Sequence, residues 1–247
     1  MKTSLQKLIA AAFLAAATLL IPGRNASAAV VVNFQLIEPL FPAYSGTAAA
    51  PDTGTYWNTV TINSASTASI SYTMPGSVFA SDGATSSGIT ISSFTPSAGT
   101  GNVGVFTGGD SSFPLVRRDL LTTGDGQVSM VIGGLTANGE YDIYFYSQNA
   151  EFHSAVTDFT IGATTESVDN RLSTQPPFSF VEGETYALFS SVVANGSGEI
   201  TVSYTSPDFE SAFNAFQVVA VPEPGTALVF LFSATGLLLF RRGRRLH

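Results

Sequence analysis

Between residues 29 and 220 the chain alternates short apolar runs with turn-forming residues. The runs are rich in Val, Ile, Thr, Tyr and Phe, and Gly, Pro, Asn, Asp or Ser interrupts them about every ten to twenty residues. This pattern is typical of β-strands. It predicts strands at residues 30–37, 56–62, 69–73, 89–94, 103–106, 115–121, 128–132, 141–148, 156–161, 186–194, 199–204 and 215–221.

No stretch outside the two ends of the chain keeps an apolar period of 3.6 residues, and no fixed repeat is visible. About a dozen strands in one domain predict an all-β fold in which two antiparallel sheets pack face to face as a jelly-roll-like sandwich. The Ala-, Gly-, Ser- and Thr-rich stretches at 45–55 and 77–88 are predicted to be long surface loops.

The clearest local unit is the segment LTANGEYDIYFY at 135–146. Asn138-Gly139 favours a turn with positive φ. In the strand that follows, alternate side chains point to opposite faces, and both sets are largely apolar. The strand is therefore predicted to be central, with Tyr141, Ile143 and Phe145 on one face and Asp142, Tyr144 and Tyr146 on the other.

The N-terminus has the layout of an export signal. Lys2 and Lys7 flank the start, an apolar stretch occupies 8–21, and Ala26-Ser27-Ala28 provides an A-x-A cleavage site. We predict a signal peptide over 1–28, which signal peptidase removes after the export machinery has engaged it. An uncleaved anchor is the alternative, although the apolar stretch is short for a membrane span.

The C-terminus carries a second membrane signal. Pro222-Glu223-Pro224 precedes the uncharged run TALVFLFSATGLLLF, which at about 1.5 Å per residue barely spans a bilayer core of roughly 30 Å. Basic residues tend to stay on the cytoplasmic side, so the acidic domain would lie on the other side. The run is closed by Arg241, Arg242, Arg244 and Arg245.

The motif at Pro222-Glu223-Pro224, the short span and the Arg cluster together resemble a PEP-CTERM sorting signal of Gram-negative bacteria, over residues 221–247. The resemblance implies an exosortase-type membrane protease as partner and an association with exopolysaccharide. It also implies a protein that is held transiently at the inner membrane and then reaches the cell surface or the extracellular matrix. A plain single-pass anchor is the alternative.

Charge is distributed very unevenly along the chain. Residues 29–220 contain three Arg, no Lys and seventeen Asp or Glu, a net charge of −14. Binding to a phosphate backbone needs Lys and Arg that displace counterions, so nucleic acid is excluded as a partner. The chain also has no cysteine, which excludes disulfides and thiolate chemistry and leaves apolar burial to stabilise the fold.

Catalytic motifs are missing from the sequence. His153 is the single histidine of residues 29–220, and no Gly-x-Ser-x-Gly elbow accompanies it. Asp52-Thr53-Gly54 matches the aspartic-protease tripeptide, but it occurs once and follows an Ala-Pro stretch, which favours a turn. Pairs of carboxylates of the glycosidase type are numerous, and nothing selects one of them. We therefore assign no catalytic residue.

Some residues are candidates for binding. The sole tryptophan, Trp57, is either a core residue or a platform for a sugar ring, and the same two interpretations apply to Tyr144 and Tyr146. Arg117 and Arg118 are either an ion-paired strand edge or a contact to an acidic sugar. Asp110 and Asp125 in Gly-rich loops are candidates for oxygen ligands of a structural Ca²⁺, and no other cofactor is expected.

The order of motifs in the second half, GEYDIY, FVEGETY, GEITV and NAFQ, resembles galactose-binding-like jelly rolls of secreted bacterial proteins. We therefore expect an exported, non-catalytic surface or matrix protein associated with exopolysaccharide. A carbohydrate-binding module with a defined glycan site is the first alternative. A secreted glycoside hydrolase or other hydrolase is the second.

Deletion of residues 221–247 should redirect the protein without unfolding it, because the last predicted strand ends at about that point and the tail carries the sorting signal. Cell fractionation and a thermal melt of the truncated chain measure the two effects. Unchanged retention of the truncated chain in the envelope would contradict the sorting function of the tail.

Overall fold

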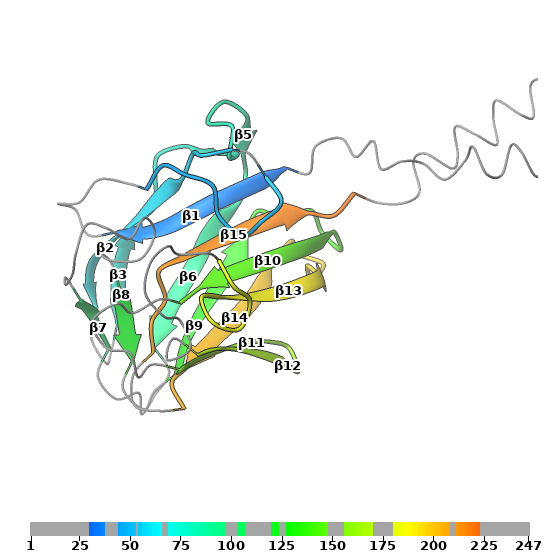
Figure 1. Ribbon diagram of the computed structural model, residues 1–247. Helices are drawn as coiled ribbons and strands as arrows, with labels where there is room; N and C mark the ends of the chain where they lie inside the picture. The colour runs from blue at the N-terminus through cyan, green and yellow to red at the C-terminus, as the bar shows by residue number, and fades with distance from the viewer. Residues whose placement is uncertain are drawn as a thin grey trace, which may run out of the picture.

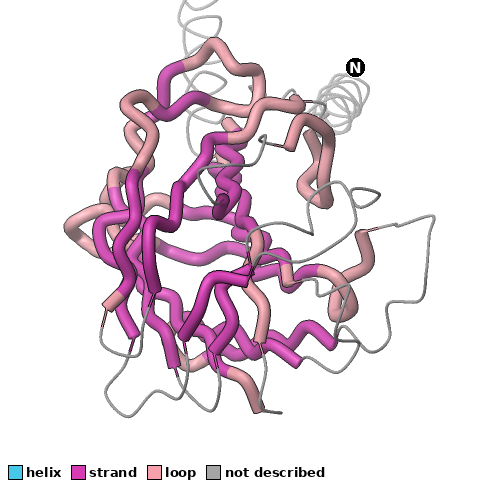
Figure 2. Tube along the Cα trace, turned by 90° about the vertical axis from the view of Figure 1, so that its left-hand side faces the viewer, coloured by secondary structure: helices cyan, strands magenta, loops and turns pink. Residues whose placement is uncertain are grey.

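Strands provide all the regular structure in the described part of the computed structural model (Figures 1 and 2). The structure describes residues 30–37, 44–52, 54–65, 69–96, 103–106, 120–123, 127–147, 156–169, 180–207 and 211–222. Within these ranges no helix is long and apolar enough to cross a membrane.

Most strands belong to two sheets. The six-stranded sheet contains, in spatial order, β13 (Tyr186–Val193), β10 (Glu140–Tyr146), β15 (Ala215–Ala220), β1 (Val31–Ile37), β2 (Asn58–Ala65) and β3 (Ile70–Thr73). The five-stranded sheet contains β12 (Thr164–Asp169), β11 (Val156–Ile161), β14 (Ile200–Thr205), β9 (Gln127–Gly133) and β6 (Thr90–Pro96). Two small ribbons pair β4 (Val78–Phe79) with β5 (Ser86–Ser87) and β7 (Val103–Phe106) with β8 (Leu120–Thr123).

The strand pairing is that of a jelly roll. Antiparallel pairs nest inside one another along the chain: β1 pairs with β15, β9 with β14, β10 with β13, and β11 with β12. Successive pairs fall in alternate sheets, as when one long hairpin is rolled up. The segments between β1 and β9 add β2 and β3 to one sheet and β6 to the other. The predicted two-sheet sandwich is therefore present.

One pair departs from the antiparallel arrangement, because β1 and β2 are parallel. A parallel pair needs a connection that returns the chain to the end of the sheet where the first strand began. Part of this connection, residues 44–52, lies against the outer face of the six-stranded sheet, and we call it the strap. The sequence predicted a surface loop here, but Ala50 of the strap is buried.

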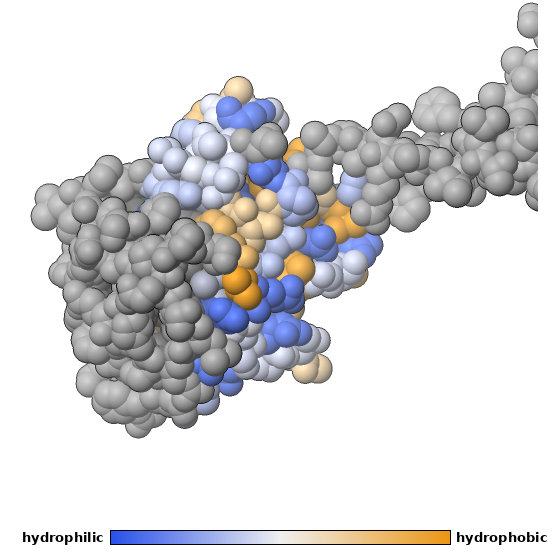
Figure 3. Space-filling view, viewed as in Figure 1, coloured by the Kyte–Doolittle hydropathy of each residue, from blue (hydrophilic) through white to orange (hydrophobic). Residues whose placement is uncertain are grey.

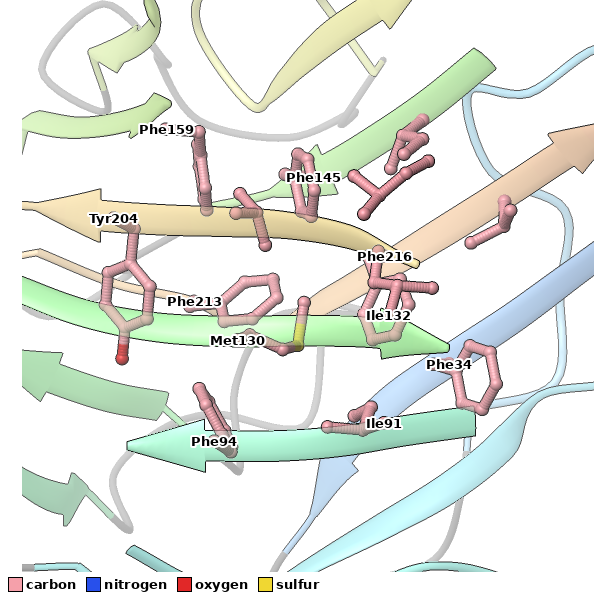
Figure 4. Close-up of a cluster of buried hydrophobic side chains, with 14 of the residues drawn as sticks. Phe34, Ile91, Phe94, Met130, Ile132, Phe145, Phe159, Tyr204, Phe213 and Phe216 are labelled. Carbon is pink, nitrogen blue, oxygen red and sulfur yellow. The ribbon is translucent and has the colours of Figure 1, made fainter. Parts of the chain in front are cut away.

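Aromatic rings fill the space between the two sheets. Phe213, two residues before the start of β15, contacts five other rings with centroid distances of 5.3–6.3 Å. Phe145 of β10 stacks on Phe159 of β11 at 4.9 Å, which joins the sheets directly. The rings around Phe213 come from both sheets (Figure 4): Phe94, Phe145, Phe159, Tyr204 and Phe216.

Most predicted strands match observed ones within a few residues. β10 is central, with Tyr141, Ile143 and Phe145 in the core between the sheets, as its alternation indicated. The sequence missed β12, since its residues TTESVD are mostly polar and exposed at a sheet edge. It also missed the β4–β5 ribbon in the stretch assigned to a loop. The first part of the strand predicted at 115–121 lies outside the described residues.

The connection from β9 to β10 changes sheets and depends on a tight backbone approach. As predicted, Asn138 has a positive φ, 58°, and Gly139 N donates to the Thr136 carbonyl at 2.9 Å. Gly134 has a φ of 70°, and a Cβ at this position would overlap the carbonyl oxygen of Gly88. The position therefore requires glycine for its conformation and for its space.

Gly134→Ala should destabilise the protein much more than Gly162→Ala. Gly162 also has positive φ, 61°, but has no atom near its missing Cβ, so its substitution costs only the left-handed conformation, about 1–2 kcal/mol. Gly134→Ala adds the overlap with Gly88 to the same cost. Urea unfolding of both variants measures the difference, and equal losses would contradict the close approach.

Candidate functional site

The outer face of the six-stranded sheet gathers aromatic side chains. Because side chains alternate along β10, Tyr144 and Tyr146 point away from the sandwich core. Trp57, just before β2, contacts Tyr146 at a centroid distance of 6.2 Å. Tyr186 of β13 contacts Tyr146 at 6.0 Å and Tyr144 at 5.7 Å. This face thus carries a continuous row of rings, and no such row exists on the described outer face of the other sheet.

The strap covers one part of this row through its backbone. Tyr44 N donates to Gln35 Oε1 at 2.7 Å, Ala49 N to the Tyr146 hydroxyl at 2.8 Å, and Ala50 N to Gln217 Oε1 at 3.1 Å. In the opposite direction, Trp57 Nε1 donates to the strap carbonyl of Gly46 at 2.9 Å. The small side chains of Ala48–Ala50 allow this close packing.

Beneath the strap lies a chain of buried polar groups with satisfied hydrogen bonds. The Tyr146 hydroxyl donates to Gln217 Oε1, whose Nε2 donates to Asn33 Oδ1 at 2.7 Å. Asn33 Nδ2 donates in turn to the Tyr56 carbonyl at 2.9 Å. Asn33, Gln217 and Tyr146 are each at most 2% exposed, so these bonds offset the loss of water contacts. Burial also raises the pKa of Tyr146 far above its usual value.

The other part of the face is only partly exposed. Tyr144 contacts Tyr186 here, Asp142 shares the outer face of β10 with Tyr144, and Glu182 forms a β-bridge with Tyr186; we call these four residues the tyrosine–carboxylate shelf. In the space-filling view, hydrophobic surface lies at the centre of this side with strongly hydrophilic residues directly beside it (Figure 3). Tyr144 is 7% exposed, Asp142 and Tyr186 are partly exposed, and Glu182 is exposed.

A bulge in β13 positions one carboxylate of the shelf. The register between β10 and β13 shifts between Tyr141 and Ile143, and Ser191 adopts a φ of 57°. The Ser191 N–H donates to Asp142 Oδ1 at 2.9 Å. Bulges commonly redirect side chains beside functional sites. Here the bulge fixes Asp142 through one oxygen.

The shelf is electrostatically negative. The pKa of Tyr144 is raised, first by burial and then by the negative charge of Asp142, by Tyr186 and by Glu182. The pKa of Tyr186 is raised by burial and by Glu182. The described ranges hold ten Asp and Glu but no Lys, Arg or His. No group of three potential metal-ligating His, Cys, Asp or Glu occurs among them.

The structure places three of the sequence-derived candidates together. Trp57 and Tyr146 are 4% and 0% exposed and belong, with Tyr144, to one cluster under and beside the strap. Neither Trp57 nor Tyr146 presents a free ring face. Outside the described residues lie Arg117, Arg118, Asp110, Asp125, Ala26, Ala28, Glu223, Pro224, Arg241, Arg242, Arg244 and Arg245. Pro222 is the last described residue and is exposed.

Asp52 of the Asp52-Thr53-Gly54 tripeptide forms a turn, as the sequence favoured. Its Oδ1 accepts a hydrogen bond from Gly54 N at 3.0 Å. The other carboxylate oxygen is buried and has no partner among the described residues.

Three members of the site were not identified from the sequence: Asp142, Tyr186 and Glu182. Asp142 shares one face of β10 with Tyr144 and Tyr146, so the D-x-Y-x-Y spacing contained the signal. Tyr186 and Glu182 join the site because Tyr186 of β13 pairs with Tyr146 of β10. This pairing is set by the register between two strands that are distant in the sequence. No local pattern predicts it.

Comparisons with known proteins give only distant structural neighbours. No family model matches the chain, and no curated protein does. One neighbour is the CBM36-1 domain of a multidomain xylanase from the hindgut metagenome of Trinervitermes trinervoides. The two sequences are 14% identical, the match covers 53% of this chain and 98% of that chain, and the TM-score is 0.29.

Two more neighbours have similar values. The CBM22-1 xylan-binding domain of Paenibacillus barcinonensis Xyn10C is 15% identical, and the match covers 53% of this chain and 86% of that domain with a TM-score of 0.30. TmCBM61, solved in complex with β-1,4-galactotriose, is 11% identical, and the match covers 52% of this chain and 83% of that chain with a TM-score of 0.29. Because these TM-scores are low, the assignment of a jelly-roll fold is based on the strand pairing of this chain itself.

Tyr146→Phe should destabilise the protein by about 1–3 kcal/mol, because Ala49 N–H loses its buried acceptor. Tyr204→Phe is the matched control. The Tyr204 hydroxyl is buried without a partner among the described residues, so its removal should be neutral or stabilising. Chemical denaturation compares the two variants, and an equal loss in Tyr204→Phe would show that its hydroxyl is bonded.

Proposed function

We propose that this protein is a non-catalytic carbohydrate-binding protein of the cell surface or extracellular matrix. The tyrosine–carboxylate shelf carries this proposal. Sugar rings present C–H faces that pack on aromatic rings, and their hydroxyls donate to carboxylates. The shelf offers both kinds of group on the outer face of the six-stranded sheet: the partly exposed Tyr186 ring beside Tyr144, and the carboxylates of Asp142 and Glu182.

The environment of the carboxylates supports a binding rather than a hydrolytic role. A glycosidase needs one carboxylic acid that stays protonated, usually in an apolar pocket. In the shelf, Asp142 is partly exposed and accepts a backbone N–H, and Glu182 is exposed to water, so neither lies in an apolar pocket. Neither residue has the environment of a general acid.

We further propose that residues 1–28 are a leader, residues 29–220 the exported domain and residues 221–247 a PEP-CTERM signal that an exosortase-type protease processes. The described ends of the domain lie together, since Ala220 N donates to the Val30 carbonyl at 3.2 Å. Leader and tail are therefore attached at the same end of the six-stranded sheet. Exopolysaccharide is the proposed ligand at the final location.

Binding of the full-length chain in a neutral detergent to a glycan array tests the carbohydrate-binding function. We expect selective, saturable binding, and we expect Tyr186→Ala to weaken it about tenfold through the loss of ring contact. Tyr56→Ala is the control, because Tyr56 is also exposed but contacts Phe79 rather than the shelf. Absence of binding to every glycan would contradict the proposal.

A further inference from the structure

The negative charge of the shelf restricts which ligands can bind there more strongly than the aromatic rings of the shelf do. Asp142 and Glu182 place two negative charges near two tyrosine rings, and no cation from the described residues balances them. An anionic sugar, such as a uronate or a sulfated residue, would be repelled. The shelf is therefore unsuited to acidic polysaccharide.

The Tyr144 hydroxyl points to the kind of group that the shelf accepts. Tyr144 as a whole is 7% exposed, but its hydroxyl is not among the buried, unpaired oxygens of the described residues. Asp142 lies two residues before Tyr144 on the same face of β10, and Tyr186, which forms a β-bridge with Glu182, contacts the Tyr144 ring at 5.7 Å. A hydroxyl that reaches the surface beside a largely buried ring is available to a ligand donor.

A bare metal ion fits the shelf poorly. Ca²⁺ takes six to eight oxygen ligands, usually several of them carboxylates. Two carboxylates and two phenols do not provide this set, and no group of three suitable ligands occurs in the described structure. A protonated amine needs less: it has three N–H donors, and tyrosine ring faces attract it.

We infer that the tyrosine–carboxylate shelf recognises a protonated amino group on a sugar, so that the preferred ligand is an amino-sugar polymer with free amines. This inference rests on the proposed carbohydrate-binding function and names its ligand class. The free oxygen of Asp142, the Glu182 carboxylate and the Tyr144 hydroxyl are the acceptors. The ring of Tyr186 faces the cation and the sugar.

The arrangement distinguishes an amino sugar from a free amine. Tyr144 lies directly opposite Leu188 in the pairing of β10 with β13, and Tyr186 is its diagonal neighbour. Leu188 and Tyr186 are partly exposed, so an apolar surface continues from the charged group along the sheet. A sugar ring attached to the amine packs on this surface, whereas a lysine side chain provides only a narrow methylene stem.

Isothermal titration of the full-length chain with two oligosaccharides of equal length tests the inference. One is a glucosamine oligomer and the other its fully N-acetylated counterpart. Acetylation removes the positive charge and leaves the sugar backbone unchanged. We expect the free-amine oligomer to bind at least tenfold more tightly, with an affinity that falls as salt is added.

Matched variants locate the effect. Asp142→Asn should lower affinity for the free-amine oligomer about tenfold and leave the bulge intact, because the Asn oxygen still accepts the Ser191 N–H. Glu166→Gln makes the same change of charge on β12 of the other sheet and should leave affinity within twofold. Thermal melts of both variants verify that they are folded.

Other outcomes overturn the inference in distinguishable ways. Equal binding of both oligomers, or equal losses in Asp142→Asn and Glu166→Gln, would reject amine recognition at the shelf while carbohydrate binding stands. Equally tight binding of polylysine would show recognition of cationic protein in place of sugar. If no glycan on the array binds, the carbohydrate-binding function fails, and the inference fails with it.

Discussion

The contact of the Phe213 ring with rings from both sheets is the interaction on which the rest of the structure depends. Phe94 and Phe159 reach it from the five-stranded sheet, and Phe145 and Phe216 reach it from the six-stranded sheet. The chain has no cysteine, so no disulfide ties the sheets together. Burial of large aromatic rings supplies much of the cohesion. Because this core fixes the inner face of β10, it also fixes which side chains of β10 point outward.

The parallel pair of β1 and β2 determines what happens on that outward face. Its return connection brings the strap across the sheet, where Tyr146 and Gln217 bind its backbone N–H groups. The strap converts half of an aromatic face into a second, smaller core around Trp57. Tyr144 belongs to the same core at 7% exposure, whereas Tyr186 at its margin is partly exposed. The covering of Trp57 and Tyr146 follows from this connection.

Negative charge gives the tyrosine–carboxylate shelf its chemical character. The described ranges hold no Lys, Arg or His, so no described cation balances the carboxylates there. Asp142 takes one N–H from the strained Ser191, and its other oxygen remains for a ligand. A surface of this kind repels phosphate and acidic sugars and attracts amines. Location at the cell surface, where polysaccharide is the abundant neighbour, would make a glycan the natural partner.

The sequence alone determined the properties that depend on neighbouring residues. Alternation along 141–146 predicted a central strand with two apolar faces, and the Asn138 turn followed from local backbone preference. The charge of −14 over 29–220 and the absence of cysteine limited the partners and the chemistry. Tertiary structure alone decided which tyrosines are covered, because burial depends on where a strap from 44–52 packs. It also decided that Tyr186 and Glu182 join Tyr144, since strands some forty residues apart acquire their register only when the shared core forms.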